Sequence, residues 1–350
     1  MVRKKVGIAM SGGVDSTVAA LLLREQGYEV HGFFMELPVA DVLRQCHRVQ
    51  TLAKAIDIPL QVVDMKKLFT KEIIDSFVGE YSKGRTPNPC VTCNATMKFG
   101  ALLDFMFDHG MDKGATGHYA CIRREGQGEY HLLRGNDPKK DQSYFLCRLQ
   151  QRQLSSILFP LGSWLKEDVF ARASSLGLSG FSSGESQDVC FLSTGLRQFL
   201  TEYGVGEKTG EIRTMDGRLL GNHSGISQYT VGQRRGLGLP DATPWYVVAL
   251  NPRHNQVIVG KNDALFTREI ILQELRWLYA EPALPWQGLV QLRSRHRPAP
   301  AVLAQAADGK WVVTCDQPQR AVTPGQFAVF YEDSRVVGSG IITAGEPSRS

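Results

Sequence analysis

From the N-terminus to about residue 200, short apolar runs alternate with longer segments in which apolar residues recur every three or four positions. Short apolar runs bounded by turn residues predict buried strands, and the periodic segments predict helices. The expected strands span 5–10, 29–35, 60–64 and 115–120, and the expected helices run from Asp15 to Gly27, over 71–82 and 96–108, and through a segment carrying Cys46. This alternation predicts an α/β domain with a doubly wound parallel sheet.

The pattern changes after about residue 203, where short β-prone segments are separated by glycine, proline and Asp-Gly turns such as Asp216-Gly217 and Asp308-Gly309. Such turns favour hairpins and small β domains. The sequence therefore predicts three domains. They span 1–203 for the α/β domain, 204–260 for a small β-rich central domain, and 261–350 for a C-terminal β-barrel.

Composition sets broad limits on the class of protein. The chain has 350 residues, 43% of them hydrophobic and 21% charged, which is ordinary for a globular protein. No apolar run approaches the roughly 18 residues of a membrane span, and no cleavable leader pattern follows Met1, so we expect a cytoplasmic protein without membrane contact. A net charge of +5 is compatible with a polyanionic partner.

Seven cysteines, odd in number and scattered, indicate reduced thiols rather than a disulfide framework. Cys46 shares a helix face with Val42, Val49 and Ala53, which predicts a place in the core. Cys315 alternates with Trp311 and Val313, which predicts a buried position in a strand.

The most informative local pattern is an apolar strand that enters Ser11-Gly12-Gly13-Val14-Asp15-Ser16 and then a helix. Glycines allow a tight turn whose backbone N–H groups, with the start of the helix, converge on an anion. The loop lacks the Gly-Lys-Ser/Thr of a Walker P-loop and the spacing of a dinucleotide fingerprint. It resembles the SGGxDS loop of the ATP-pyrophosphatase superfamily, whose members adenylate an oxygen and release pyrophosphate. A ligand-free glycine turn is the alternative.

Three further cysteines are candidates for chemistry. Cys90 and Cys93 form a C-x-x-C after the proline-rich segment Arg85–Pro89, at the expected start of a helix, and Cys190 lies in a polar segment. Thiols at a helix start are readily ionised. Taken alone, the pair is compatible with structural thiols, a redox pair or half of a metal site, and without a second C-x-x-C a four-cysteine zinc site is disfavoured.

With these motifs, the ordered set of segments in the chain resembles the bacterial tRNA-specific 2-thiouridylase family, MnmA, over nearly the whole length. The segments that carry this resemblance are SGGVDS, Phe34-Met35, GRTPNP at 84–89, Cys93-Asn94, ATGHY at 115–119, KDQSYFL at 140–146, Cys190-Phe191, TVGQRRGLG at 230–238 and VTPGQFAVFY at 322–331.

The resemblance implies an adenine nucleotide alpha hydrolase-like PP-loop domain that binds ATP and Mg²⁺ and adenylates the C2 oxygen of a wobble uridine. It implies that Cys190 carries a persulfide and that Cys93 is the nucleophile, leaving a Cys93–Cys190 disulfide to be reduced. It further implies an ATP site at Ala9, Met10, Ser11, Gly12, Gly13, Val14, Asp15, Ser16, Met35 and Gly117, and contacts with tRNA or its target base at Asn88, Pro89, Cys90, His118, Lys140, Asp141, Gln142, Arg295, His296 and Gln326.

Partners implied in the same way are tRNAs for Lys, Glu and Gln and a protein that donates sulfur. The C-terminal domain would bind the tRNA. His118 is also compatible with a purely structural role. Arg293, Arg295 and Arg297 alternate, which predicts one face of a strand suited to phosphates or simply to solvent.

The chain departs from the family pattern at two places. Cys90 stands where most relatives have aspartate, and the segment from Met35 to Asp41 is shorter than usual. Cys90, Cys93 and Cys190 together suggest an alternative in which the three thiolates hold a [4Fe–4S] cluster. The sequence is also compatible with a tRNA cytidine 2-thiolase, with an amide-forming ligase, and with a paralogue that binds tRNA without catalysis.

Overall fold

The computed structural model describes residues 3–126, 128–177, 189–206 and 208–346. The chain divides into two compact units. The first contains the residues up to Ile73, Cys90–Ser193 and Ser334–Val337, and the second contains Ile74–Pro89, Thr194–Asp333 and the residues from Gly338 onward. The two units are described in turn.

The first unit is built on a five-stranded parallel sheet with strand order β3-β2-β1-β4-β7. Its strands are β1 (Lys5–Ala9), β2 (Glu29–Glu36), β3 (Leu60–Asp64), β4 (Lys113–Ala115) and β7 (Ile157–Leu158). The order extends to both sides of β1 and all pairings are parallel, which confirms the doubly wound sheet. The strands predicted at 5–10, 29–35 and 60–64 are β1, β2 and β3.

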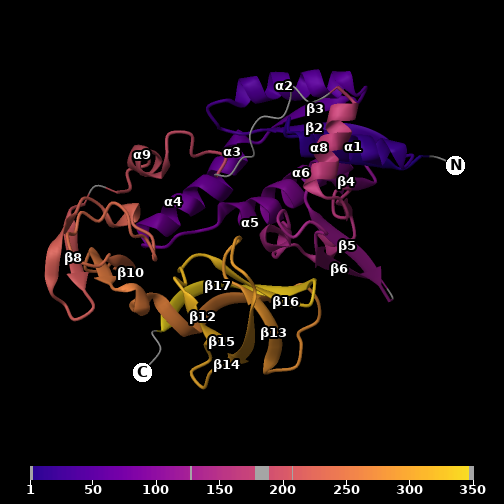
Figure 1. The fold of residues 1–350 in the computed structure, drawn as a ribbon. Coiled ribbons are helices and arrows are strands. Elements are labelled where there is room, and N and C mark those ends of the chain that lie inside the picture. The colour runs from indigo at the N-terminus through magenta and orange to yellow at the C-terminus, as the bar shows by residue number, and fades with distance from the viewer. Residues whose placement is uncertain (1–2, 127, 178–188, 207, 347–350) are drawn as a thin grey trace. The chain divides into compact units, whose positions relative to one another are not determined.

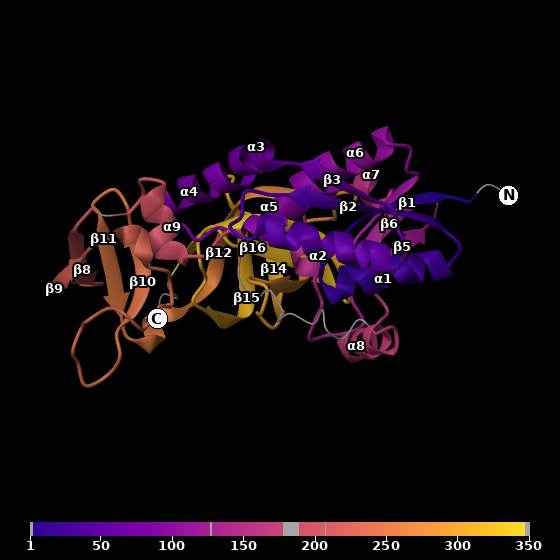
Figure 2. The ribbon, with the colours of Figure 1, turned by 90° about the horizontal axis from the view of Figure 1, so that it is seen from above.

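Helices cover both faces of this sheet. On one face lie α1 (Val14–Glu25), α2 (Val42–Ala55) and α8 (Lys166–Ser175), and on the other lies α6 (Leu102–Asp108) (Figure 2). The sheet's glycines allow α6 to approach closely, because a Cβ on Gly7 would come within 2.9 Å of Met106 and one on Gly114 within 2.4 Å of Leu103. Both faces are therefore buried, as parallel sheets require.

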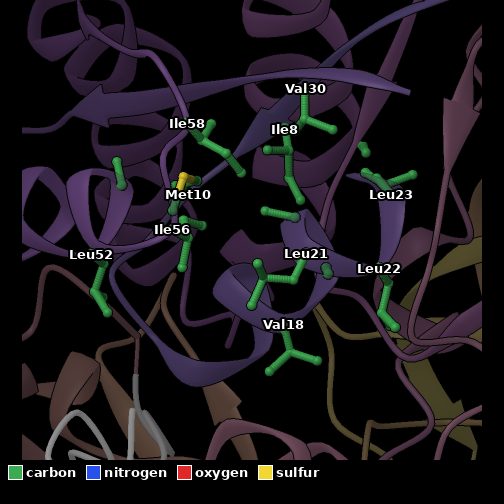
Figure 3. Packing of buried hydrophobic residues seen from close by; sticks show 14 of the residues in the cluster. Ile8, Met10, Val18, Leu21, Leu22, Leu23, Val30, Leu52, Ile56 and Ile58 are labelled. Carbon is green, nitrogen blue, oxygen red and sulfur yellow. The ribbon is translucent and has the colours of Figure 1, made fainter. Parts of the chain in front are cut away.

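The core between the sheet and the first face consists mainly of aliphatic side chains from β1, β2, α1, α2 and α8 and the segments that join them. Ile8 of β1 and Val30 of β2 pack among the leucines of α1 and Leu52 of α2, as Figure 3 shows. Cys46 of α2 packs against the same cluster, which confirms the core position predicted for it.

The remaining elements of the first unit are short. A continuous helical run from Pro89 to Asp108 consists of α5 (Pro89–Cys93), the π-helix η2 (Asn94–Ala101) and α6. This run is preceded by α3 (Lys66–Phe69) and by the π-helix η1 (Thr70–Ile74), which continues into α4 (Asp75–Ser82). It is followed by the hairpin of β5 (Ala120–Glu125) and β6 (Glu129–Arg134), and then by η3 (Ser143–Leu146) and α7 (Gln151–Leu154). Arg335, at the start of β17, pairs with Leu133 of β6.

Three predicted boundaries are wrong. The helix expected at 96–108 begins at Pro89, because proline suits the first helical position, where its missing N–H is not needed. The helix expected at 71–82 begins at Lys66. The strand expected at 115–120 is confined to β4, and residues 116–119 form a loop before β5.

The second unit is mostly β structure. A four-stranded sheet has the order β10-β11-β8-β9, formed by β8 (Gly210–Thr214), β9 (Leu219–His223), β10 (Tyr246–Asn251) and β11 (Gln256–Gly260). Pairing of β12 with β17 closes a six-stranded barrel, drawn in orange to yellow in Figure 1. Its strands are β12 (Phe266–Trp277), β13 (Trp286–Gln291), β14 (Ala299–Gln305), β15 (Trp311–Arg320), β16 (Phe327–Glu332) and β17 (Arg335–Glu346).

The unit also contains the helices α4 (Asp75–Ser82) and α9 (Leu196–Glu202), which meet through Phe77 and Phe199, and the short turns η5 (Ile226–Gln228) and η6 (Asn262–Leu265). Cys315 is buried in β15, as predicted. Among the described residues of both units, no helix has the length and apolar character needed to cross a membrane.

Leu52 and Leu43 of α2 test the packing of the first core. Leu52 is 1% exposed and Leu43 is 78% exposed. Replacing Leu52 with alanine should lower the free energy of unfolding by about 2–5 kcal/mol, since it leaves a cavity, whereas Leu43→Ala should change it by about 0.5 kcal/mol or less. Urea denaturation followed by circular dichroism measures both. Equal effects would contradict the packing described.

Candidate functional site

The segment Ala9–Ser16 forms a tight loop at the carboxyl end of β1. Gly12 has a φ of +78°, a conformation that L side chains rarely adopt, and α1 begins at Val14. The Ser16 hydroxyl donates to the carbonyl of Gly13 (3.1 Å) and accepts from the backbone N–H of Ser11 (3.3 Å). The loop is thus braced from within, in the geometry expected of a phosphate cradle.

Asp15 of this loop is held by two side chains that are remote in sequence. The Lys166 ammonium of α8 donates to both carboxylate oxygens, at 2.6 and 2.7 Å, and the Tyr119 hydroxyl donates to Oδ1 at 2.8 Å. The Lys166 side chain is only 13% exposed. A carboxylate and an ammonium therefore lie side by side at the glycine loop, as a site for phosphate and a divalent cation needs.

Gly117 lies against the backbone of the same loop. A Cβ at this position would come within 2.9 Å of the carbonyl carbon of Asp15 and the nitrogen of Ser16, so only glycine permits the approach. Met35 lies in β2, two positions beyond Phe33, whose carbonyl accepts from the N–H of Met10. The residues expected at an ATP site thus come from the carboxyl ends of neighbouring parallel strands, where ligands of such sheets bind.

Cys90, Cys93 and Cys190 form a second cluster in the first unit. The charges of Cys90 and Cys93 act on the Cys190 thiol and the charge of Lys98 acts on all three thiols, so these groups lie within electrostatic range of one another. Cys90 and Cys93 come from α5, Lys98 from η2, and Cys190 from the segment before α9. The pairing of Cys190 with Cys93 stays a prediction of the family resemblance.

The environment keeps these thiols protonated at neutral pH. The Cys90 and Cys190 side chains reach solvent, yet dense protein surrounds them, and this desolvation raises the pKa of Cys90 and Cys93 and raises that of Cys190 to about 11. The neighbouring thiolates raise the pKa of Cys190 further, whereas Lys98 lowers the pKa of each thiol. Ionisation of one sulfur therefore opposes ionisation of the next.

The described residues contain no group of three or more His, Cys, Asp or Glu side chains arranged to hold a metal ion. Although the three thiols interact, their arrangement does not fit cluster ligation. The iron–sulfur alternative thus has no support in this geometry.

His118 follows Gly117 directly and is buried. Its Nδ1 lies 2.6 Å from the Thr116 hydroxyl, and its ring packs between Phe99 and Phe159. Burial, followed by the charge of Lys98, lowers its pKa well below the ordinary value, so the imidazole is neutral at pH 7. The loop 116–118 thus contacts the glycine loop through Gly117 and, through the His118 ring, Phe99 of the helical run that carries Cys90 and Cys93.

The residues expected to contact tRNA in the segment 140–142 are largely bonded within the protein. Asp141 accepts from the Arg134 guanidinium (2.7 Å) and from the N–H and hydroxyl of Ser143. Gln142 accepts from the N–H of Tyr119 (3.0 Å), and its own N–H donates to the Tyr119 carbonyl. Gln142 therefore fixes the loop that carries His118, Asp141 ties the end of β6 to Ser143, and Lys140 is half-buried beside them.

In the second unit, Asn88 is half-buried and Pro89 is buried at the end of the proline-rich segment. The Gln326 amide donates to the carbonyl of Thr86 at 2.7 Å, and a Cβ on Gly325 would come within 2.9 Å of Thr86. The loop before β16 thus packs directly on the segment that precedes the C-x-x-C.

The arginine-rich segment is not the predicted strand. β13 ends at Gln291, and residues 293–296 form a turn in which the N–H of His296 donates to the carbonyl of Arg293. The His296 ring accepts from the N–H of Leu292 and contacts Gln319, so it stabilises the turn, and burial lowers its pKa. Arg293, Arg295 and Arg297 remain exposed, from a turn rather than a strand face.

Three residues of the site escaped the sequence analysis. Lys98 lies five positions after Cys93, a spacing that an α-helix would not bring onto one face. Lys166 and Tyr119 lie more than 100 residues from Asp15, and nothing local in the sequence signals these contacts. Only the folded sheet brings them to the loop.

A parallel-sheet domain with a glycine-rich anion loop and a nearby thiol cluster defines a class of nucleotide-using α/β enzymes. Consistently, the family described as tRNA methyl transferase HUP domain matches residues 4–194, its PRC-barrel domain matches 197–261, and the family described as aminomethyltransferase beta-barrel domain matches 267–342.

Full-length relatives specify the family further. The chain is 42% identical to tRNA-specific 2-thiouridylase MnmA of Geobacter metallireducens, over 98% of this chain and 97% of the relative. It is 42% identical to MnmA of Desulfotalea psychrophila, over 98% of this chain and 100% of the relative. It is 43% identical to MnmA of Syntrophotalea carbinolica, over 97% of this chain and 98% of the relative. The chain belongs to the tRNA-specific 2-thiouridylase MnmA family.

The contact of Gly117 with the loop gives a direct test of the nucleotide site. Gly117→Ala should force Asp15 and Ser16 to shift and weaken ATP binding by roughly tenfold or more, the cost of an added methyl in a packed site. Isothermal titration with ATP measures this. Gly79→Ala is the control, because nothing lies within 4 Å of its Cβ position. Unchanged ATP affinity in Gly117→Ala would remove this loop from the site.

Proposed function

We propose that the chain is an ATP-dependent tRNA uridine 2-sulfurtransferase acting on the wobble uridine. The observation that carries the proposal lies within the first unit. Gly117 contacts the glycine loop, and the ring of the adjacent His118 packs on Phe99 of η2, the helical segment that follows Cys90 and Cys93. A base whose oxygen is activated at the loop would therefore lie near the sulfur chemistry.

In the first half-reaction, the loop Ala9–Ser16 binds ATP, with Met35 and Gly117 at its border. Backbone N–H groups around Gly12 and Gly13 and the start of α1 stabilise the phosphates, and Mg²⁺ supplies charge neutralisation beside Asp15 and the loop hydroxyls. The C2 oxygen of the uridine attacks the α-phosphorus and pyrophosphate leaves. AMP then serves as the leaving group at C2.

In the second half-reaction, Cys190 carries a persulfide that brings sulfur to C2. Cys93 attacks the inner sulfur of Cys190, so the terminal sulfur leaves with the bonding electron pair and enters the pyrimidine as AMP departs. A Cys93–Cys190 disulfide remains, and an external thiol reductant restores both thiols. Because the thiols are protonated at rest, Cys93 reacts through its minor thiolate form.

Around this core, the proposal assigns Asn88, Pro89, Cys90 and His118 to the target base, and the segment Lys140–Gln142 to the tRNA, directly or through the loops they brace. The domains are assigned as 1–203, 204–260 and 261–350, the last binding tRNA through Arg295, His296 and Gln326. The expected partners are tRNAs for Lys, Glu and Gln and a protein sulfur donor, in the cytoplasm.

Serine variants test the sulfur assignments. Cys93→Ser and Cys190→Ser should each abolish 2-thiouridine formation in an anticodon stem-loop while ATP binding is retained, because the loop lies outside the thiol cluster. Cys315→Ser, in the barrel core, is the control for general loss of a thiol. Mass spectrometry of the nucleosides gives the product. Sulfur transfer by both site variants would remove the assignment.

The same assay separates the alternatives. A cytidine 2-thiolase would yield 2-thiocytidine, a ligase would yield no thionucleoside, and a binding-only paralogue would show no tRNA-dependent AMP. An assay for iron in protein purified anaerobically would distinguish the persulfide route from the iron–sulfur alternative. Activity without iron or acid-labile sulfide supports the persulfide route, and activity that requires both would replace it with the cluster.

The exposed arginines of the 293–297 turn should bind phosphates of the tRNA. Replacing Arg293, Arg295 and Arg297 with glutamine should weaken tRNA binding. The slope of log K against log salt concentration should become less steep by about one unit for each arginine–phosphate pair that is removed. Arg268→Gln, an exposed arginine of β12 in the same barrel, is the control. Fluorescence anisotropy, recorded from low to moderate salt, measures the tRNA affinity and its salt dependence for each variant. An unchanged slope in the triple variant would place the tRNA elsewhere.

A further inference from the structure

The helical run that carries the cysteine pair contains a π-helical segment, η2, held by a side chain from another element. Gln153 of α7 is 5% exposed, and its amide nitrogen donates to two carbonyls of this segment, those of Ala95 (2.9 Å) and Phe99 (2.7 Å). Its amide oxygen accepts from the N–H of Gln150 at 2.8 Å. Every polar atom of this buried side chain is therefore engaged.

These bonds fall where helical hydrogen bonding is irregular. In a π-helix the bonds run from residue i to i+5, the geometry is rare, and isolated segments of it persist where other interactions stabilise them. Gln153 bonds carbonyls four residues apart, on successive turns of η2. A second buried amide, that of Asn94, donates to the carbonyl of Phe145 at 3.0 Å and anchors the start of the segment.

The π-helical winding determines what faces the cysteines. Bonding from i to i+5 places residues five apart on nearly the same side, whereas α-helical winding separates them. Cys93 and Lys98 have this spacing. Phe99, whose carbonyl Gln153 holds, is itself fixed by ring contacts with His118 and Phe159, so the backbone that carries Lys98 is held on both sides.

We propose that Gln153 is a positioning residue, which keeps the π-helical turn wound and thereby holds the Lys98 ammonium beside the Cys93 sulfur. This role rests on the proposed function of Cys93. Thiol–disulfide exchange requires a thiolate, and a nearby cation stabilises it as negative charge moves between sulfurs. The positive charge of Lys98 acts on four titratable groups, which are Cys90, Cys93, Cys190 and His118.

The test measures the pH dependence of alkylation of Cys93 by iodoacetamide, with peptide fragmentation to separate Cys93 from Cys90. Gln153→Met retains side-chain volume but cannot donate to the two carbonyls. Unwinding of η2 would carry Lys98 away, and the midpoint of alkylation should rise by about one pH unit, as expected for loss of a close opposite charge. Lys98→Met should shift the midpoint in the same direction.

Gln151→Met is the matched control. Gln151 lies on the same short helix and also bonds backbone through its side chain, but its partner is Tyr130 of β6. A rise in Gln153→Met with a wild-type midpoint in Gln151→Met supports the proposal. A wild-type midpoint in folded Gln153→Met, or an equal rise in both glutamine variants, overturns it.

Should Gln153→Met fail to fold, Lys98→Met decides, since an unchanged midpoint there overturns the proposal by itself. The measurement needs neither tRNA nor ATP. Its failure is therefore separate from failure of the proposed sulfur transfer, which the nucleoside assay reports.

Discussion

The first unit depends on one close backbone approach. Gly117, in the loop after β4, lies so near Asp15 and Ser16 that no side chain fits between them. This approach sets the position of the next residue, His118, which is buried between Phe99 and Phe159. A loop of three residues thereby couples the glycine turn at the end of β1 to the helical run that carries the cysteine pair. Under the proposed function, the oxygen that is adenylated and the carbon that receives sulfur belong to the same C2 carbonyl, and this short connection suits that requirement.

The charged groups near the site form two separate sets, one at the glycine loop and one at the thiols. At the glycine loop, Lys166 neutralises Asp15 at hydrogen-bond distance. At the thiols, one ammonium, Lys98, opposes the desolvation that keeps three sulfurs protonated. All three thiols are protonated at neutral pH, and because neighbouring thiolates raise the pKa of Cys190, a state with two ionised sulfurs is less accessible than a state with one. That state suits a sequence of exchange steps between two cysteines, in which one sulfur attacks and the other leaves.

The strongly periodic parts of the fold could be predicted from the sequence. Because both faces of the sheet are buried, apolar residues recur in a regular pattern in β1, β2, β3 and α2. The glycine loop also follows from its local pattern, whereas the pairing of Cys190 with Cys93 comes from the family resemblance and stays a prediction. The start of the helix at Pro89 was missed because two prolines suggest a loop, although proline suits a first helical turn. The arginine alternation was misread because period two does not distinguish a strand from a turn without the ladder of hydrogen bonds. Lys166, Tyr119 and Gln153 act through contacts far apart in the chain, and no local pattern encodes them.

Many residues that the family resemblance assigns to tRNA are bonded to the protein itself. Gln142 braces the loop of His118, Asp141 ties Arg134 to Ser143, Gln326 holds Thr86, and His296 closes the arginine turn. A side chain committed in this way loses little entropy when a ligand arrives, and it holds the neighbouring backbone in one conformation. Under the proposed function, recognition would depend on the shape of these preformed loops and on the exposed guanidiniums of the 293–297 turn. An anticodon loop, whose bases are already unstacked, suits such a surface better than a duplex would. Selectivity among tRNAs would therefore follow from loop geometry, and the substituted position, Cys90, would affect the chemistry more than the choice of substrate.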